Sequence, residues 1–171
     1  MAGGFTPPDA LRTGVLLDAG HPRCTIWYMR FDDEVMIDAS SGDVWAIYSD
    51  VERWPEWTAS IRSVCYVEGS ALTVGARVRI EQPKLRTTVW EIGDVDLGRS
   101  WTWVAKGPGI RTTAVHTLDP VGVNATRVHQ TIIQSGPLGV VFGRLYSRLT
   151  RSYLAMEGAG LRQRCEANAS A

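Results

Sequence analysis

Four polar side chains fall on strand faces that are otherwise apolar, and they are the best candidates for chemistry in this chain. They are Gln82, Thr88, His116 and Gln130. Because successive side chains of a strand point to opposite faces, each shares its face with the residues two positions away, which are mainly Val, Ile, Leu and Trp. A few polar groups in an apolar lining are typical of a small-molecule pocket. The alternative is a filled core in which these groups bond one another or water.

His116 is the candidate catalytic residue, because histidine takes up and releases a proton near neutral pH. Burial would favour its neutral form, which suits a general base. Gln82 or Gln130 could orient the ring or hold a substrate carbonyl. His129 falls on the opposite face of its strand. The alternative for His116 is a structural histidine bonded to the backbone or to a neighbour.

Aromatic and aliphatic residues complete the predicted ligand-binding set. Trp90, Trp101 and Trp103 lie on two adjacent predicted strands and can pack against a flat or polycyclic ligand, or simply against the core. The last predicted helix adds Phe142, Leu145, Leu149 and Tyr153. These positions form core or pocket wall, and the Tyr153 hydroxyl either bonds a ligand or anchors the helix.

The first elements that must position these residues can be read from residue spacing. From Thr25 to Ile37 apolar residues recur with period two, which predicts a half-buried strand with a bulge or turn at Asp32-Asp33. Ser40 can cap a short helix, and Pro55 can open a second one. We expect Trp45, Trp54 and Trp57 to pack at the corner between these helices.

Six further strands and a long helix follow. The strands are expected near 62–68, 73–82, 86–95, 100–106, 110–119 and 125–134. Strands joined by such short turns form an antiparallel meander. Pro137 can open the last helix, which we expect to run unbroken to about Cys165. Its predicted apolar stripe consists of Leu138, Val141, Phe142, Leu145, Leu149, Tyr153 and Met156. Its arginines are expected to face water, with contact to an anionic membrane as the minor alternative.

The predicted fold class is therefore α+β, with a curved seven-stranded antiparallel sheet around a long C-terminal helix and two short helices after the first strand. One face of such a sheet must be buried, and the last helix is the only large apolar element that can cover it. A cavity between the two is the natural ligand site. We expect residues 1–23 to be a flexible leader, residues 24–166 the domain and residues 167–171 a tail.

The order of elements and several short motifs resemble the SRPBCC superfamily, also called START-like or Bet v 1-like, which has a helix-grip fold. Within it, the chain is most similar to the polyketide cyclase/dehydrase family. The resemblance covers about residues 25–165. It rests on Ile37-Asp38-Ala39, Val44-Trp45, Ser49 to Trp57, Arg99 to Trp103, Thr126-Arg127-Val128, Ser135-Gly136, Tyr153-Leu154 and Glu157. The resemblance implies that the chain binds a small hydrophobic molecule.

Composition excludes several other classes of protein. Lys plus Arg and Asp plus Glu number 18 each, so no basic excess favours nucleic acid. No apolar stretch is long enough for a membrane span, and no signal peptide is evident. The three cysteines, Cys24, Cys65 and Cys165, are scattered, so we expect reduced thiols and a cytoplasmic protein. As a separate expectation, the protein is a monomer or a homodimer. No phosphate loop or metal-ligand spacing occurs, so we expect no cofactor and no metal.

Together with the resemblance, these features favour a cyclase or dehydratase that acts on a polyketide-like substrate. A shaped pocket lowers the entropic barrier to folding a flexible chain, and an acid/base group completes the proton transfers. The alternatives are a non-catalytic carrier or sensor of a lipid-like hydrophobic ligand and, less favoured, an interaction module.

Overall fold

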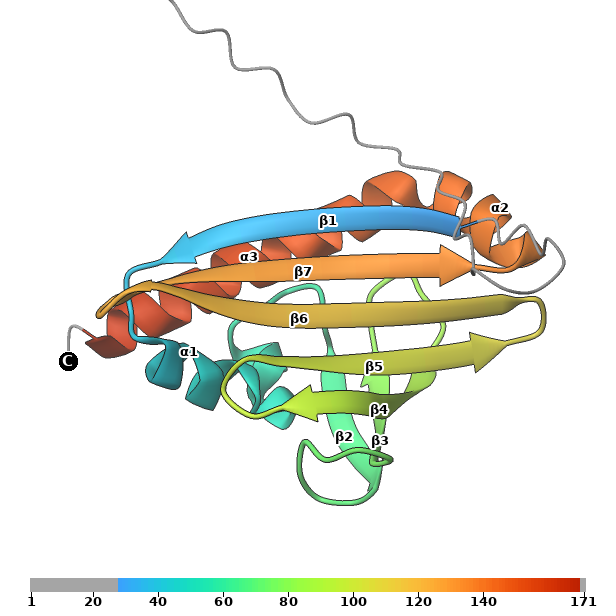
Figure 1. Ribbon diagram of the computed structural model, residues 1–171. Helices are drawn as coiled ribbons and strands as arrows, with labels where there is room; N and C mark the ends of the chain where they lie inside the picture. Colours follow the sequence, from blue (N-terminus) through green and yellow to red (C-terminus); the bar gives the residue numbers. More distant parts are fainter. Residues whose placement is uncertain (1–27, 170–171) are drawn as a thin grey trace, which may run out of the picture.

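A computed structural model describes residues 28–169 (Figure 1). Its strands bury alternate side chains, as the period-two pattern requires. The strands are β1 (Tyr28–Ile37), β2 (Ser63–Glu68), β3 (Arg77–Glu81), β4 (Thr88–Asp96), β5 (Ser100–Gly107), β6 (Ile110–Gly122) and β7 (Ala125–Ser135). They form one antiparallel sheet in the order β1-β7-β6-β5-β4-β3-β2. The predicted meander is confirmed, and β1 closes it by pairing with β7.

The assignment of strand faces from the sequence is confirmed where the core is densest. Buried positions on β3 to β7 include Val78, Ile80, Ile92, Trp101, Trp103, Ala114, His116, Leu118, Val128 and Gln130. Each of them either is Trp101 or Trp103 or shares its strand face with Gln82, Thr88, His116 or Gln130, as the alternation predicts. Strand β3 starts at Arg77, later than expected, because Gly75 adopts a positive φ of 87° in the turn that precedes it.

The predicted bulge or turn at Asp32-Asp33 is wrong. Strand β1 pairs with β7 without a register shift, and Asp33 lies opposite Gln130. Asp33 therefore falls on the inward face with Met29 and Phe31, and is only partly exposed. Its carboxylate has room because Gly158 has no side chain: a Cβ there would lie 2.9 Å from Asp33 Oδ2.

Two short helices follow β1, as predicted. The Ser40 side chain caps α1 (Ser41–Tyr48) by accepting a hydrogen bond from the Asp43 backbone N–H at 3.2 Å. The second helix, η1 (Val51–Glu56), is a 3₁₀-helix that begins before Pro55, so the prediction that Pro55 opens it is wrong. Trp54 in η1 is buried and stacks on Tyr48 with ring centroids 5.1 Å apart.

The last helix is broken, which corrects the prediction of one continuous helix. It consists of α2 (Pro137–Leu145) and α3 (Ser147–Ala169), which Figure 1 shows as separate segments behind the sheet. The side chains of α3 that face the core are Tyr153, Leu154, Glu157, Leu161 and Cys165. Helix α3 extends past the expected end of the domain at residue 166. The leader expected at residues 1–23 lies outside the described residues.

Most of the predicted apolar stripe on the last helix is also wrong. Leu138, Val141, Phe142, Leu145 and Met156 are exposed, and Leu149 is half-buried. Of that stripe only Tyr153 is buried. Helix α2 instead turns Gly139 and Gly143 inward, where a larger side chain would collide with β7 and β1.

Candidate functional site

Inward side chains of the central strands meet α3 around a small, partly open cavity of about 50 Å³. The residues that line it are Trp54, Ile61, Ile80, Gln82, Trp90, Trp103, Ala114, His116, Gln130, Thr131, Ile132, Leu154 and Glu157. A water molecule occupies about 30 Å³ of liquid. The cavity therefore has room for one or two water molecules, and aromatic side chains fill most of the space around it.

His116 lies in a box of aromatic rings on the wall of this cavity. Its ring stacks on Trp101 with centroids 4.5 Å apart and contacts Trp103 edge-on at 5.2 Å. Tyr48 and Trp54 close two further sides. Burial lowers the pKa of His116 to about 3, although a hydrogen bond with the Trp101 backbone opposes the shift. The imidazole is therefore neutral near pH 7. It can take part in hydrogen bonds at this pH, but it is too weak a base to accept a proton readily, and it does not carry the second ring proton that a general acid would donate.

Neutral His116 gives the first testable prediction. Its pKa in the fold lies below the ordinary 6.5, so the unfolded chain binds more protons as pH falls. Stability is therefore lost as pH drops from 6.5 toward 3. Between pH 6.5 and pH 5, the free energy of unfolding measured in urea should fall by about 2 kcal/mol more for wild type than for His116→Gln. His129→Gln, at a partly exposed surface histidine, is the matched control. Parallel pH profiles for wild type and His116→Gln would contradict the prediction.

Glu157 is a buried carboxyl group on the α3 side of the same cavity. It is 7% exposed, and its Oε1 accepts a hydrogen bond from Ser60 Oγ at 2.9 Å. Ser60 Oγ lies 2.9 Å from Thr58 Oγ1, which continues the chain of hydroxyl groups. Burial raises the pKa of Glu157 to about 7, the Ser60 hydrogen bond lowers it in part, and the charge on Asp33 raises it further. Both protonation states of Glu157 are therefore populated near neutral pH.

Several buried polar atoms around the cavity have no hydrogen-bond partner within residues 28–169. They are Gln130 Nε2 and Oε1, His116 Nδ1 and the Tyr48 hydroxyl. Gln130 is 1% exposed, so water outside the fold does not satisfy it. Buried polar groups in native proteins are normally bonded to protein, ordered water or ligand. This cluster therefore has hydrogen-bonding capacity to offer a polar group that enters the cavity.

The structure brings five of the predicted site residues together and leaves six outside. Gln82, Trp90, Trp103, His116 and Gln130 line the cavity. Trp101 lies behind His116. Thr88, Phe142, Leu145, Leu149 and Tyr153 do not line it. The Thr88 hydroxyl donates to the Arg86 carbonyl, and the Tyr153 hydroxyl donates to the Pro83 carbonyl, which ties α3 to the loop after β3.

Sequence reasoning left eight of the thirteen cavity-lining residues out of the predicted site, among them Trp54 and Glu157, and it also missed the carboxyl group of Asp33, which lies near Glu157 without lining the cavity. Trp54 lines the cavity, although we expected it only to pack at the helix corner. Glu157 falls four residues after Tyr153 on the buried face of α3, a spacing that could have identified it. Asp33 interrupts the alternation of β1 with a carboxyl, and burial raises its pKa.

A wider hollow of about 550 Å³ lies elsewhere, as an open groove between η1 and the C-terminal half of α3. Trp57 and Arg164 border it, and Arg164 is paired there with Glu56 at 3.3 Å. None of the predicted site residues lines this groove. The smaller cavity, with its unpaired polar atoms, is therefore the candidate functional site.

Comparison with known proteins places the chain in a family. The family model described as "Polyketide cyclase / dehydrase and lipid transport" matches residues 28–166, and the chain belongs to that family. No curated protein sequence matches the chain. No helix in residues 28–169 is both long and apolar enough to cross a bilayer. No cluster of three potential metal ligands occurs among the side chains of the same residues.

Solved structures share the helix-grip fold at low sequence identity. The Zhui aromatase/cyclase from Streptomyces sp. R1128 has a TM-score of 0.67 at 13% identity, covering 81% of this chain and 94% of that one. Norcoclaurine synthase from Thalictrum flavum, a point mutant with a transition-state analogue, scores 0.66 at 12% identity, covering 84% and 97%. A START superfamily protein from Mycobacterium smegmatis scores 0.63 at 15% identity, covering 79% and 97%.

Proposed function

We propose that this protein binds a small, largely apolar molecule between the sheet and α3, and that it acts as a cofactor-independent cyclase or dehydratase on a polyketide-like substrate. One observation carries the proposal. An aromatic cavity holds a carboxyl group poised near neutrality beside buried polar atoms that have no partner within residues 28–169. Apolar walls suit the carbon skeleton, and the polar atoms suit a carbonyl or hydroxyl group on it.

Binding requires the cavity to open. Pockets for small molecules usually have volumes of about 300–1,000 Å³, whereas this cavity has about 50 Å³. The Gln82 end is the natural entrance, because one tyrosine-to-carbonyl hydrogen bond, from Tyr153 to Pro83, holds the loop there against α3. Helix α3 and the β3–β4 loop separate when this bond breaks, and a ligand stabilises the open form by binding it preferentially.

In the proposed reaction, Glu157 moves a proton within a β-hydroxy carbonyl substrate. Its carboxylate takes the proton from the carbon between the two oxygen-bearing carbons, while Gln130 Nε2 donates a hydrogen bond to the carbonyl oxygen. Neutral His116 gives its one N–H to the Trp101 backbone, so its free Nδ1 accepts a hydrogen bond from the substrate rather than donating one. Protonated Glu157 then gives that proton to the departing hydroxyl group. The C–H and C–O bonds break, a C=C bond forms and water leaves, so neither an oxidant nor a reductant is needed. A general acid/base with a pKa near the working pH performs both transfers best.

A non-catalytic carrier is the second candidate, favoured by the mainly apolar lining of the cavity and by the lipid transport that the family description includes. A carrier holds its ligand away from water and needs no chemistry at Glu157. The two functions separate by experiment, because a carrier binds the molecule and returns it unchanged.

Binding is tested with aromatic ketones such as flavone and anthraquinone. A ligand should quench tryptophan fluorescence and stabilise the fold, by about 2.7 kcal/mol at one hundred times its dissociation constant. Trp103 lines the cavity and Trp101 does not, although both are buried. Trp103→Phe should therefore lose more of the quenching than Trp101→Phe. Native mass spectrometry of the purified protein would identify a co-purified ligand. A broad panel that neither quenches fluorescence nor raises the melting temperature would overturn the proposal.

A further inference from the structure

Helix α2 is packed the opposite way round from an ordinary surface helix. Gly139 and Gly143 face the sheet so closely that a Cβ on Gly143 would lie 2.8 Å from Met29 Cγ. Its large apolar side chains face outward: Leu145 is 71% exposed and Val141 58%. Together with Leu138 and Phe142 they lie within a narrow sector of the helix, and we call these four residues the outer face of α2. Surface helices normally turn their apolar stripe to the core.

The outer face of α2 is surrounded by basic residues. Residues 97–118 and 120–156 contain no Asp or Glu. Arg144 and Arg148 flank the outer face, and Lys106 and Arg111 lie on the β5–β6 hairpin, all of them exposed. The hairpin adjoins α2, because the Leu138 N–H donates to the Gly109 carbonyl at 3.0 Å. None of the ion pairs within residues 28–169 includes any of these four cations.

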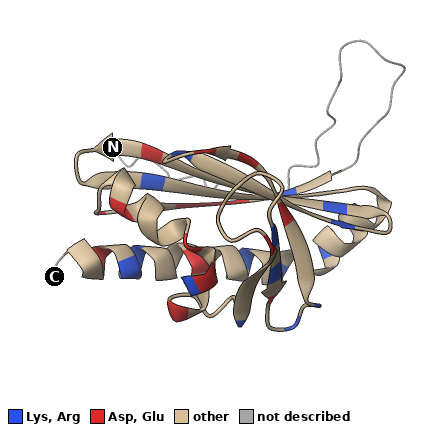
Figure 2. Cartoon of the chain, turned by 90° about the horizontal axis from the view of Figure 1, so that it is seen from below, with Lys and Arg blue, Asp and Glu red and all other residues tan. Residues whose placement is uncertain are grey.

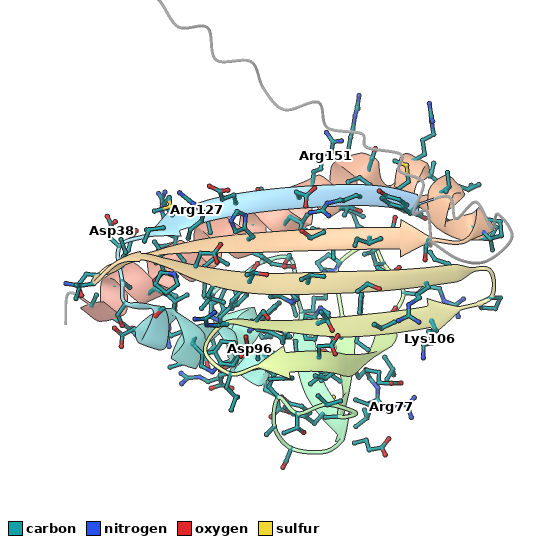
Figure 3. All side chains as sticks on the ribbon, viewed as in Figure 1. Asp38, Arg77, Asp96, Lys106, Arg127 and Arg151 are labelled. Atoms are coloured by element: carbon teal, nitrogen blue, oxygen red, sulfur yellow. The ribbon has the colours of Figure 1, made fainter. Side chains whose placement is uncertain are left out.

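The figures show how the charges lie at this end of the molecule. Figure 2 shows basic segments at the end that carries α2 and the β5–β6 hairpin, whereas acidic segments lie toward the middle and the opposite end. Lys106 lies at the outer end of β5 with its side chain directed away from the sheet (Figure 3). An apolar helix face bordered by cations therefore occupies one end of the fold.

We propose that α2 docks the protein onto the surface of an anionic lipid bilayer. The outer face of α2 enters the boundary between headgroups and acyl chains, while Lys106, Arg111, Arg144 and Arg148 meet the lipid phosphates. Helices that combine an apolar face with Lys or Arg bind such interfaces, and each cation adds to the attraction. The charges argue against a second copy of the chain as the partner. A two-fold contact through this face would bring the same cations together, and neither α2 nor residues 100–118 of the hairpin contain an Asp or Glu to pair with them.

The docking face adjoins the wall of the cavity. Met29, Phe31 and Leu154 form an apolar cluster near α2, against which Ile132 and Val140 pack. Ile132 and Leu154 also line the cavity. Docking through α2 would therefore bring this apolar end of the candidate site close to the lipid. The inference does not depend on the proposed function, because it rests on the exposed helix and its charges alone.

The test is sedimentation of the full chain with vesicles of phosphatidylcholine alone or mixed with phosphatidylglycerol. We expect binding to the anionic vesicles to exceed binding to neutral ones by about tenfold or more, and to weaken at high salt. Val141→Ser with Leu145→Ser should reduce binding to anionic vesicles by about tenfold or more. Arg144→Gln with Arg148→Gln should remove most of the preference for anionic lipid.

The matched control replaces exposed apolar residues at the opposite end. Leu97 and Val123 are 79% and 89% exposed in the β4–β5 and β6–β7 turns. Leu97→Ser with Val123→Ser should bind like wild type, and circular dichroism should show that every variant is folded. Three results would each overturn the proposal: no binding by wild type, equal binding to both vesicle types, or an equal loss in the control. Light scattering that shows self-association through α2, without vesicle binding, would assign the face to a second copy instead.

Discussion

Replacing Glu157 with glutamine is expected to lower turnover of a polyketide-like substrate by about 10²-fold or more, the usual size of an acid/base contribution. Glutamine keeps the shape of the side chain and its hydrogen bond with Ser60 but carries no transferable proton. Ligand affinity should change little, because the apolar walls remain. The matched control is Glu166→Gln, which removes a carboxyl group from a partly exposed position on the same helix. Steady-state kinetics across pH is the measurement.

The same substitution has a second readout that needs no substrate. The pKa of Glu157 in the fold, about 7, lies above its ordinary 4.5. Between these values the unfolded chain releases a proton that the folded chain keeps, so stability falls as pH rises from 4.5 to 7. Glu157→Gln lacks this loss. Relative to wild type, the variant should gain stability on the order of 3 kcal/mol between pH 4.5 and pH 8 in urea unfolding.

The two readouts separate the possible outcomes. Turnover that survives Glu157→Gln would remove this residue from the mechanism, whatever happens to stability. A pH-independent stability difference would show that Glu157 is not held in the protonated form. Ligand binding without turnover in wild type would favour the carrier. Between pH 4.5 and 6.5 the contribution of His116 to stability rises with pH, whereas that of Glu157 falls. The two contributions nearly cancel, so these two groups together should change the stability of the wild type little over this range.

Leu161→Ala is expected to destabilise the protein by about 2–5 kcal/mol, whereas Leu145→Ala should stay within about 0.5 kcal/mol. Leu161 on α3 is fully buried in the main core cluster with Val44, Trp54 and Ile92. Its truncation leaves a cavity that the packed aromatic rings cannot fill. Leu145 on α2 is 71% exposed, so its truncation removes little buried area.

Urea unfolding of the two leucine variants at one pH makes the comparison direct. Both substitutions remove the same atoms from a helix, so differences in helix propensity largely cancel. Similar losses from the two variants would mean that α2 is covered in solution. A large loss from Leu145→Ala alone would mean that the register of the last helices differs from the one described.

The sheet could be predicted from the sequence because alternation is a local property. His116 and Gln130 were placed inward by their neighbours two residues away, and the structure agrees. The structure of the last helix could not be predicted in this way, because the spacing of its hydrophobic residues does not reveal the break at Tyr146. Nor does that spacing show that close packing on the sheet selects Gly139 and Gly143 over larger apolar residues.

The candidate site was predictable only in part, for a physical reason. Sequence rules assign carboxyl groups to the surface, since burying a charge is costly. Asp33 and Glu157 violate that rule, and only the assembled fold shows the Ser60 hydroxyl and the space at Gly158 that accommodate them. The filling of the interior by Trp54 and its neighbours likewise depends on how the η1 corner meets the sheet.

The glycines of α3 bear on any attempt to engineer a more heat-resistant version of this protein. Gly158 and Gly160 are the first positions that a stabilising redesign would change, since glycine in a helix interior costs about 1 kcal/mol relative to alanine. Here a methyl group at Gly160 would overlap the Trp57 carbonyl oxygen, and one at Gly158 would press on the Asp33 carboxylate. Combinatorial libraries should therefore hold both glycines fixed and vary the outward positions of α3, such as Gln163.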